Sequence, residues 1–231
     1  MTFKVPEGWR FVNAKRAIAS ILWVLAALAL SGVGEYYISR QMGWESIEHA
    51  YLPIIAVIGG FILLLFAVTG RLLILKRSAF SPLNFKTTNI TIGVLYGFAT
   101  YTIGSATSVF LHYMFKFEVP KWYIKVLTPK STADFILYLL TIGILTAICE
   151  ESLFRHFLQK TLTEWVGPAG IFVASAIFGA LHAEPDLLWR AIPALIVGLL
   201  LGFGYYKRGL TFSIAAHAMN NCIAVSLAYL L

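Results

Sequence analysis

Three groups of polar side chains interrupt stretches of this sequence that are otherwise apolar. They are Glu150, Glu151 and Arg155 in AICEESLFRHF, His182 with Phe178 before it in AIFGALHAEPD, and His217, Asn220 and Asn221 in SIAAHAMNNCI. An ionisable group inside a bilayer costs roughly 3 kcal/mol or more, so such residues mark functional sites by default. Carboxylate, imidazole and carboxamide groups together could supply a general base and hydrogen-bond donors.

The first group predicts two carboxylates with different tasks. Glu150 and Glu151 are adjacent, so on a helix they point about 100° apart. Glu151 and Arg155 are spaced i,i+4 and can form an ion pair. Glu150 then has no obvious local partner, and an unpaired carboxylate in an apolar site can act as a general base. The alternative is that both glutamates are merely solvated at the membrane interface.

The other two groups repeat a spacing of four residues. Phe178 and His182 share one helical face, as do His217 and Asn221. An imidazole beside a carboxamide presents donors to one point. A packing histidine, or a hydrogen bond between helices, would leave the same pattern.

The composition requires a membrane. Hydrophobic residues make up 59% of the 231 residues and charged residues 13%, whereas soluble domains are about half apolar and one-quarter charged. The surplus apolar surface must face lipid. The net charge of +7 comes from basic residues between apolar stretches, which favours contact with lipid headgroups over nucleic acid.

The apolar stretches predict an all-α fold, a polytopic membrane helical bundle of about seven transmembrane helices. Six of them lie at roughly 17–34, 51–75, 90–115, 169–183, 187–206 and 211–231, and the fourth in order starts near 133 and runs through Glu150 into a polar continuation. We expect residues 1–132 to form three N-terminal helices. Residues 133–231, the last four helices, carry all of the motifs and form the predicted catalytic core.

Helix lengths and loop charges predict where the motifs meet. Twelve of the 18 Lys and Arg residues fall on the N-terminal side, which predicts a cytoplasmic N-terminus in the cell membrane. Glu150 and His182 lie at similar distances from the hairpin at 167–170, and His217 and Asn221 lie about 10–15 Å past the turn at 207–209. We therefore expect a site in the cytoplasmic half of the bilayer. His156, further along the same helix, should face headgroups.

The three motifs in order resemble the CPBP (CAAX protease and bacteriocin-processing, or Abi) family of intramembrane metalloproteases, which includes CAAX prenyl protease 2 and lysostaphin resistance protein A. They read Glu-Glu-x-x-x-Arg at 150–155, Phe-x-x-x-His at 178–182 and His-x-x-x-Asn at 217–221. The resemblance covers roughly 133–225. It implies an endopeptidase acting on a membrane-associated or lipid-anchored substrate, such as a CAAX protein or a bacteriocin or peptide precursor.

The resemblance also implies a role for each motif residue. Glu150 would activate water with His182 beside it, and His217 and Asn221 would stabilise the oxyanion. The supporting residues would be Glu151, Arg155 and Phe178.

Whether a metal takes part stays open at this point. Glu150, His182 and His217 form a candidate zinc ligand set with water in the fourth position. The sequence lacks the His-Glu-x-x-His spacing of many zinc proteases, and a metal-free glutamate mechanism suits the same residues.

Two other functions are compatible with these residues. A transporter or proton-coupled channel would use intramembrane Glu and His to relay protons, and a catalytically silent immunity or scaffold protein would share the fold. A transporter should show broken helices in two related halves, which this sequence does not show. The oligomeric state does not follow from the sequence.

Overall fold

The computed structural model describes residues 12–41, 51–78, 86–117, 119–183 and 187–230. Every regular element in these ranges is a helix. Six helices are long and apolar enough to cross a membrane, and a seventh apolar helix is shorter. The chain is therefore a multi-pass helical bundle, which confirms the predicted fold class, including the short fifth helix.

The N-terminal part contains three long helices and one short one. They are α1 (Ala14–Gln41), α2 (Tyr51–Leu73), α3 (Thr87–Phe115) and α4 (Lys121–Leu127). Pro120 is the N-cap of α4, a place where the missing N–H of proline costs nothing.

A continuous helical rod follows, from Thr132 to Val166. Its segments are α5 (Thr132–Tyr138), η2 (Leu139–Leu145), α6 (Thr146–Glu151), η3 (Ser152–Gln159) and α7 (Lys160–Val166). The Ser131 side chain accepts a hydrogen bond from the Asp134 N–H and so caps the start of the rod. Gly167, with φ of 66°, ends it in a conformation that suits glycine.

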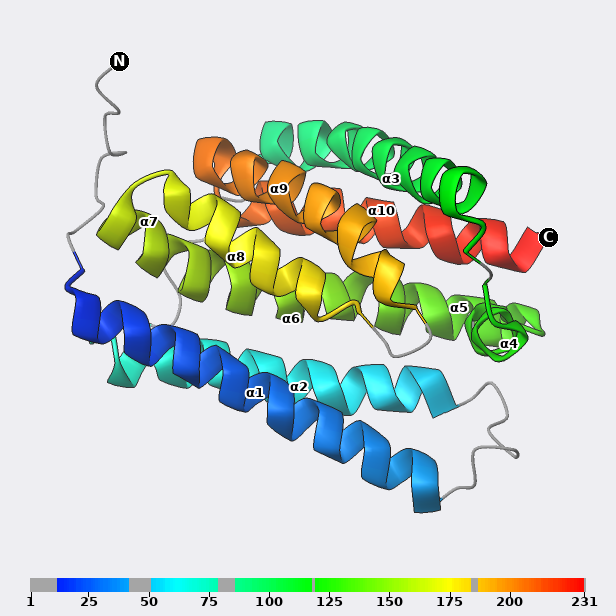
Figure 1. Ribbon diagram of the computed structural model, residues 1–231, viewed down its shortest axis with the longest axis horizontal. Coiled ribbons are helices and arrows are strands. Elements are labelled where there is room, and N and C mark those ends of the chain that lie inside the picture. The colour runs from blue at the N-terminus through cyan, green and yellow to red at the C-terminus, as the bar shows by residue number, and fades with distance from the viewer. Residues whose placement is uncertain (1–11, 42–50, 79–85, 118, 184–186, 231) are drawn as a thin grey trace.

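The last part of the chain contains α8 (Ala169–Ala180), η4 (Leu188–Arg190), α9 (Ala191–Arg208) and α10 (Leu210–Leu230). Figure 1 shows α1 and α2 on one side of the rod and α3, α9 and α10 on the other. Because α8 is only 12 residues long, its C-terminal end lies within the length of the bundle and not at the end of the bundle.

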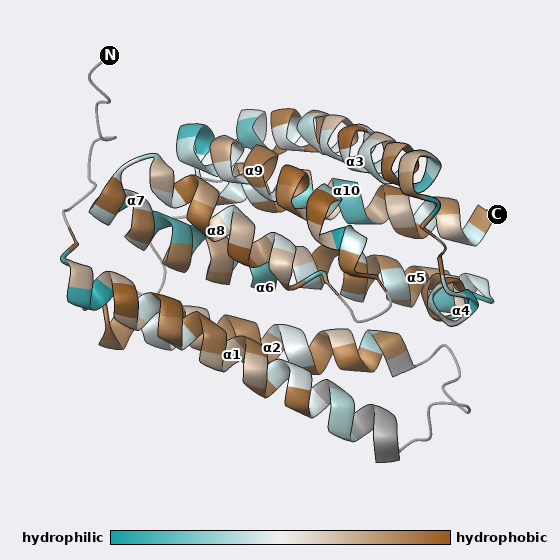
Figure 2. Cartoon of the chain, viewed as in Figure 1, coloured by the Kyte–Doolittle hydropathy of each residue, from teal (hydrophilic) through white to brown (hydrophobic). Residues whose placement is uncertain are grey.

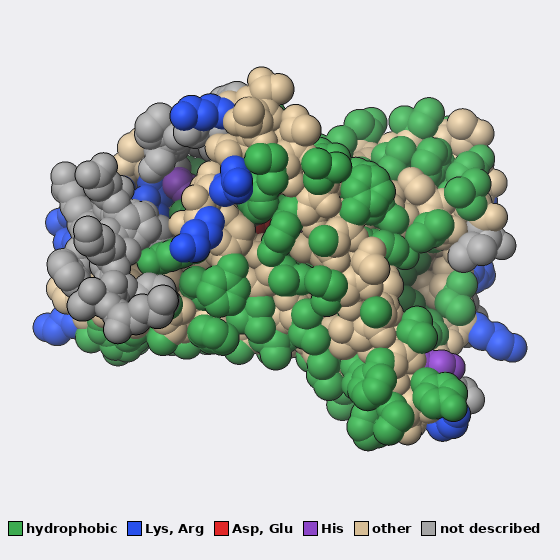
Figure 3. Space-filling view, turned by 90° about the horizontal axis from the view of Figure 1, so that it is seen from above, with side chains coloured by type: hydrophobic (Ala, Val, Ile, Leu, Met, Phe, Trp, Pro, Cys, Tyr) green, Lys and Arg blue, Asp and Glu red, His purple; other side chains and the backbone are tan. Residues whose placement is uncertain are grey.

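The outer surface has the character of a lipid-facing surface. Brown, apolar residues run along most of each long helix in Figure 2. Leu22, Phe61 and Leu95 are among many large apolar side chains that are exposed. Figure 3 shows Lys and Arg gathered toward the two ends, with apolar side chains over much of the surface between them. An apolar belt between charged ends is the pattern of a membrane-spanning bundle.

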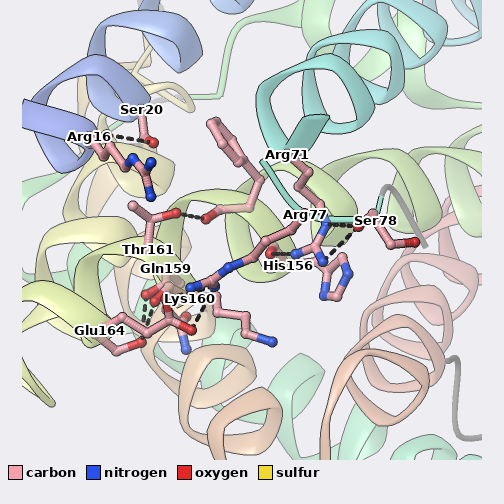
Figure 4. A network of polar contacts seen from close by, with 12 residues as sticks. Arg16, Ser20, Arg71, Arg77, Ser78, His156, Gln159, Lys160, Thr161 and Glu164 are labelled. Atoms are coloured by element: carbon pink, nitrogen blue, oxygen red, sulfur yellow. Dashed lines mark hydrogen bonds and ion pairs between the residues drawn. The ribbon is translucent and has the colours of Figure 1, made fainter. Parts of the chain in front are cut away.

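The α1–α2 pair is joined to the rod by buried polar contacts (Figure 4). The guanidinium of Arg71 at the end of α2 is 2% exposed and donates to the carbonyls of His156, at 2.9 Å, and Ser78, at 3.0 and 3.1 Å. Arg77 pairs with Glu164 of α7 at 2.7 Å. These contacts hold an arginine inside the bundle, where its donors are satisfied by carbonyl groups.

The predicted position of His156 is wrong. Its side chain is 8% exposed, and Nδ1 lies 3.4 Å from the hydroxyl of Tyr205 on α9. The expectation of a headgroup contact treated residues 156–165 as projecting from the membrane. Instead, α1, α2 and α9 surround this end of the rod, so the histidine is inside the protein.

Glycines allow α3 to approach α10 closely. A Cβ added at Gly97 would lie 2.6 Å from the Ala216 carbonyl oxygen and 2.5 Å from Met219 Cβ. Small residues such as glycine allow the backbones of membrane helices to approach this closely. The carbonyl in question precedes His217, so this approach also fixes the position of a motif residue.

We therefore predict that Gly97→Val destabilises the protein by about 1–3 kcal/mol, because the added side chain must push α3 away from α10. Thermal unfolding in detergent, followed by intrinsic fluorescence or light scattering, measures the effect. Gly32→Val on α1 is the matched control, because nothing lies within 4 Å of its added Cβ. Equal stability of the two variants would show that the close contact is not needed.

Candidate active site

The two adjacent glutamates lie where the rod changes its helical geometry. α6 carries Glu150 and Glu151 at its C-terminal end and lies between the π-helical segments η2 and η3. A π-helix closes its hydrogen bonds from i to i+5, so each segment shifts the faces on which the following side chains lie. π-Helical turns of this kind are frequent at functional sites.

A buried chain of ionic contacts starts from Glu151. Its Oε1 lies 3.0 Å from Nδ1 of His217, and its Oε2 lies 3.3 Å from Nε of Arg155. Glu151 and Arg155 are fully buried and His217 is 4% exposed. The i,i+4 ion pair expected from the sequence is thus present. Because a carboxylate only accepts, Nδ1 of His217 must be the donor to Glu151.

Glu150 lies on the other side of the same imidazole. Its Oε2 is 3.8 Å from Nε2 of His217, which is longer than a hydrogen bond. The Glu150 side chain keeps 18% of its surface exposed, whereas that of Glu151 is fully enclosed. Of the two carboxylates, Glu150 is the one that water or a substrate can reach.

His182 lies in the turn that follows α8, and its ring orientation is set by one hydrogen bond. Nδ1 is 2.8 Å from the carbonyl oxygen of Phe178, so Nδ1 carries the proton. The neutral ring then has its lone pair on Nε2, which can accept a hydrogen bond from water.

Phe178 is the packing centre of the site. Its ring centroid lies 4.6 Å from that of His182 and 6.0 Å from that of His217. The guanidinium of Arg155 lies 5.1 Å from the same ring. Phe178 is only 2% exposed, and its ring packs near both imidazoles.

Asn221 is held by two hydrogen bonds. Its Nδ2 donates to the Ile142 carbonyl in η2 at 3.1 Å, and its Oδ1 accepts from Nδ2 of Asn220, also at 3.1 Å. A carboxamide has two N–H groups, and the bond to Ile142 uses only one of them. The π-helical segment η2 therefore positions the amide of α10.

Most of these residues share a cavity of about 580 Å³. Its wall includes Phe178, His182, His217, Asn220 and Asn221. Glu150, Glu151 and Arg155 are not part of this wall, but His217, which is, lies close to both carboxylates. A cavity of this size is in the usual range for small-molecule and peptide-side-chain sites.

Several residues of this region were not singled out from the sequence. Gln159 accepts from Nη1 of Arg155 at 3.4 Å and donates to the Gly202 carbonyl at 2.8 Å, so it links the ion pair to α9. Tyr101, Ser105 and Arg190 also line the cavity. Gln159 lies four residues after Arg155, a helical spacing that could have indicated it. No motif marks the residues of α3.

The zinc ligand set of Glu150, His182 and His217 stays a prediction. Within the described ranges, no three His, Cys, Asp or Glu side chains form a cluster that could hold a metal ion. Nδ1 of His217 is engaged by Glu151 and Nδ1 of His182 by a carbonyl, which leaves Nε2 of each ring as the nitrogen for water or a metal.

The buried pair of Glu151 and Arg155 predicts a large effect of removing one partner. Arg155→Met leaves the Glu151 carboxylate in the bundle without its cation, which typically costs about 3–5 kcal/mol. The thermal midpoint in detergent should fall sharply. Arg208→Met at an exposed position should leave it nearly unchanged. A small effect of Arg155→Met would mean that water replaces the guanidinium.

Comparison with protein families gives an independent result for this part of the chain. Residues 132–223 match the model described as type II CAAX prenyl endopeptidase Rce1-like. No curated protein and no solved structure matches the chain. The matched stretch begins at the first turn of the rod and ends in α10, so it contains all three motifs. Residues 132–223 of this chain are therefore similar to the Rce1-like type II CAAX prenyl endopeptidase family.

Proposed function

We propose that the protein is an intramembrane endopeptidase that hydrolyses a peptide bond in a membrane-associated or lipid-anchored substrate. One observation supports this proposal above the others. His217 lies between the carboxylates of Glu150 and Glu151 and, together with His182 and Asn221, lines one cavity inside a membrane-spanning bundle. The match of residues 132–223 to an endopeptidase family model agrees with a proteolytic function.

In the proposed mechanism, Glu150 is the general base. It takes a proton from a water molecule as the water oxygen attacks the carbonyl carbon of the substrate. Nε2 of His182 accepts a second hydrogen bond from the same water. This nitrogen carries the lone pair, because the ring proton is on Nδ1 and is donated to the Phe178 carbonyl. When the C–N bond breaks, Glu150 passes its proton to the leaving nitrogen. The products are a carboxylic acid and an amine.

The proposed oxyanion site consists of His217 and Asn221. Nδ1–H of His217 donates to Glu151, whereas Glu150 lies 3.8 Å from Nε2, beyond hydrogen-bond distance. In a doubly protonated ring, Nε2–H is therefore not committed to Glu150 and donates to the oxyanion. The second amide N–H of Asn221 would be the other donor. Each such donor typically contributes about 3 kcal/mol to transition-state stabilisation.

Glu151 and Arg155 act through His217 in this scheme and do not touch the substrate. Glu151 holds the imidazole by Nδ1, and Arg155 balances the charge of Glu151. Phe178 sets the separation of the two imidazoles. These three are positioning residues.

Glu150→Gln is the central test. The amide keeps the shape of the side chain but cannot take the proton of water, so the turnover rate should fall about 10²–10⁴-fold. The measurement is cleavage of an internally quenched, lipid-modified peptide by purified protein in phospholipid nanodiscs. Asp134→Asn is the matched control, because it removes a half-buried carboxylate at the beginning of the same rod, far along the chain from Glu150.

Cleavage by Glu150→Gln at the rate of the unmodified protein would overturn this mechanism. A cellular function that survives Glu150→Gln while cleavage is lost would instead support a scaffold. Activity that persists after dialysis against a strong chelator is the expected result for the scheme above. Loss of activity on chelation, with recovery on adding zinc, would assign Glu150 and the histidines a ligand role.

We further propose that the N-terminus is cytoplasmic and that Glu150 and His217 lie in the cytoplasmic half of the membrane. The end of the bundle with the 207–209 turn carries more of the described basic residues than the end with α4. In membrane proteins, the end with more Lys and Arg residues usually faces the cytoplasm.

Two exposed lysines at opposite ends of the bundle test the orientation. Lys76→Cys and Lys125→Cys are made in a background in which Cys149 and Cys222 are changed to Ala. A membrane-impermeant thiol reagent added to intact cells should label position 125 and spare position 76. The opposite labelling pattern would place the N-terminus outside.

A further inference from the structure

Part of the cavity wall comes from α3, which lies outside the stretch that matches the family model. Tyr101 and Ser105 of α3 line the same cavity as His217, Asn220 and Asn221 of α10. Both α3 residues are half-buried, and their spacing of four residues puts them on one helical face. The proposed hydrolytic groups therefore share their cavity with two hydroxyl groups of an N-terminal helix.

Ser105 differs from the other hydroxyl side chains around it on α3. In a helix, a Ser or Thr hydroxyl can donate to a backbone carbonyl about one turn earlier. The other Ser and Thr residues from position 91 onward in α3 all do so, and they are Thr91, Thr100, Thr102, Thr107 and Ser108. The hydroxyl of Ser105 has no hydrogen-bond partner among the residues that the structure describes.

Tyr101 shows the same contrast with a second tyrosine of α3. The hydroxyl of Tyr96 donates to the Leu200 carbonyl on α9 at 3.2 Å, whereas that of Tyr101 has no partner within the described ranges. A hydroxyl without a partner is costly inside an apolar bundle unless water or a ligand supplies one. Tyr101 and Ser105 thus offer two uncommitted donors to a molecule that fills the cavity.

Two close contacts define how α3 lies against α10. A Cβ added at Gly93 would lie 2.7 Å from the Phe212 carbonyl oxygen, and one added at Gly97 would lie 2.6 Å from that of Ala216. Four residues along α3 therefore correspond to four residues along α10. The two helices run in the same direction, as Figure 1 also shows.

The same register brings the two uncommitted hydroxyl groups beside the motif of α10. One further turn of α3 places Tyr101 level with Asn220, and the next places Ser105 level with Ala224; all four residues line the cavity. Asn221, the amide of the proposed oxyanion site, is adjacent to Asn220 in the chain. Tyr101 therefore lies at the level of the proposed oxyanion site, and Ser105 lies one turn beyond it.

The spacing of the two hydroxyl residues suits an extended peptide. Four residues of an α-helix rise about 6 Å, and two residues of an extended chain span about 7 Å. In an extended chain, alternate carbonyl groups point to the same side. Two donors one helical turn apart can thus bind the carbonyl groups of residues i and i+2 of a peptide that lies along α3.

We propose that Tyr101 and Ser105 bind two alternate main-chain carbonyl groups of the peptide substrate and hold it extended along α3. The proposal deepens the proposed function and rests on it. The peptide then lies in the cavity beside His217 and Asn221. Because main-chain groups are common to all sequences, these hydroxyl groups contribute affinity that depends little on the side chains of the substrate.

The test measures binding, so that it does not require turnover. Glu150→Gln protein in phosphatidylcholine nanodiscs is titrated with a fluorescent, lipid-modified hexapeptide. Tyr101→Phe and Ser105→Ala, each added to Glu150→Gln, should weaken binding about two- to ten-fold, because each removes one neutral hydrogen bond. Tyr113→Phe and Thr102→Val are the matched controls and should leave binding unchanged, because both side chains are exposed and neither lines the cavity.

Altered peptides assign the effect to particular carbonyl groups. In a series of hexapeptides, one peptide bond at a time is replaced by a trans alkene, which keeps the shape of the bond but lacks its carbonyl oxygen. One altered peptide should bind equally well with and without Tyr101→Phe. The peptide altered two residues away should bind equally well with and without Ser105→Ala. A merely structural effect of a substitution would be the same for every peptide.

The outcomes separate these contacts from the proposed hydrolysis. No binding of the hexapeptide, no loss of affinity in either variant, or an equal loss for every altered peptide overturns the carbonyl contacts whatever the activity. The expected pattern, in a protein that with Glu150 intact cleaves no peptide, supports the contacts and contradicts the hydrolytic scheme. Tighter peptide binding by Tyr101→Phe in ester-linked but not in ether-linked phosphatidylcholine overturns the proposal and assigns the hydroxyl group to a lipid carbonyl.

Discussion

The buried contact between Glu151 and His217 is the interaction on which the site depends. It joins the rod to α10 at 3.0 Å, inside a membrane-spanning bundle where water cannot substitute for either partner at low cost. Arg155 balances the carboxylate from the same rod, and Gln159 connects Arg155 to α9. One carboxylate therefore fixes three helices relative to one another while its neighbour Glu150 stays accessible.

This division between the two glutamates follows from their being adjacent on a helix. Side chains one residue apart point in different directions, so one can be enclosed while the other is reached from outside. The enclosed carboxylate orients the imidazole by Nδ1, and the accessible one faces Nε2. The same logic places an orienting carboxylate behind the histidine in other hydrolytic sites.

Much of this arrangement could be predicted from residue types and spacing. Long apolar runs predict the spans, and the i,i+4 spacing predicts the pair of Glu151 with Arg155. Other features depend on tertiary contacts that leave no periodic signal. His156 looks interfacial in the sequence, yet α1, α2 and α9 enclose it. The approach of α3 to α10 depends on Gly97, and isolated glycines do not identify their partners.

The shortness of α8 has a consequence for the surrounding lipid. At 1.5 Å per residue its 12 residues extend about 18 Å, well below the roughly 30 Å thickness of the hydrocarbon layer. Such a mismatch is relieved by local thinning of the bilayer. Thinning would bring bulk water toward His182, which lies in the turn after that helix, so the thickness of the host membrane would influence how readily the interior is hydrated.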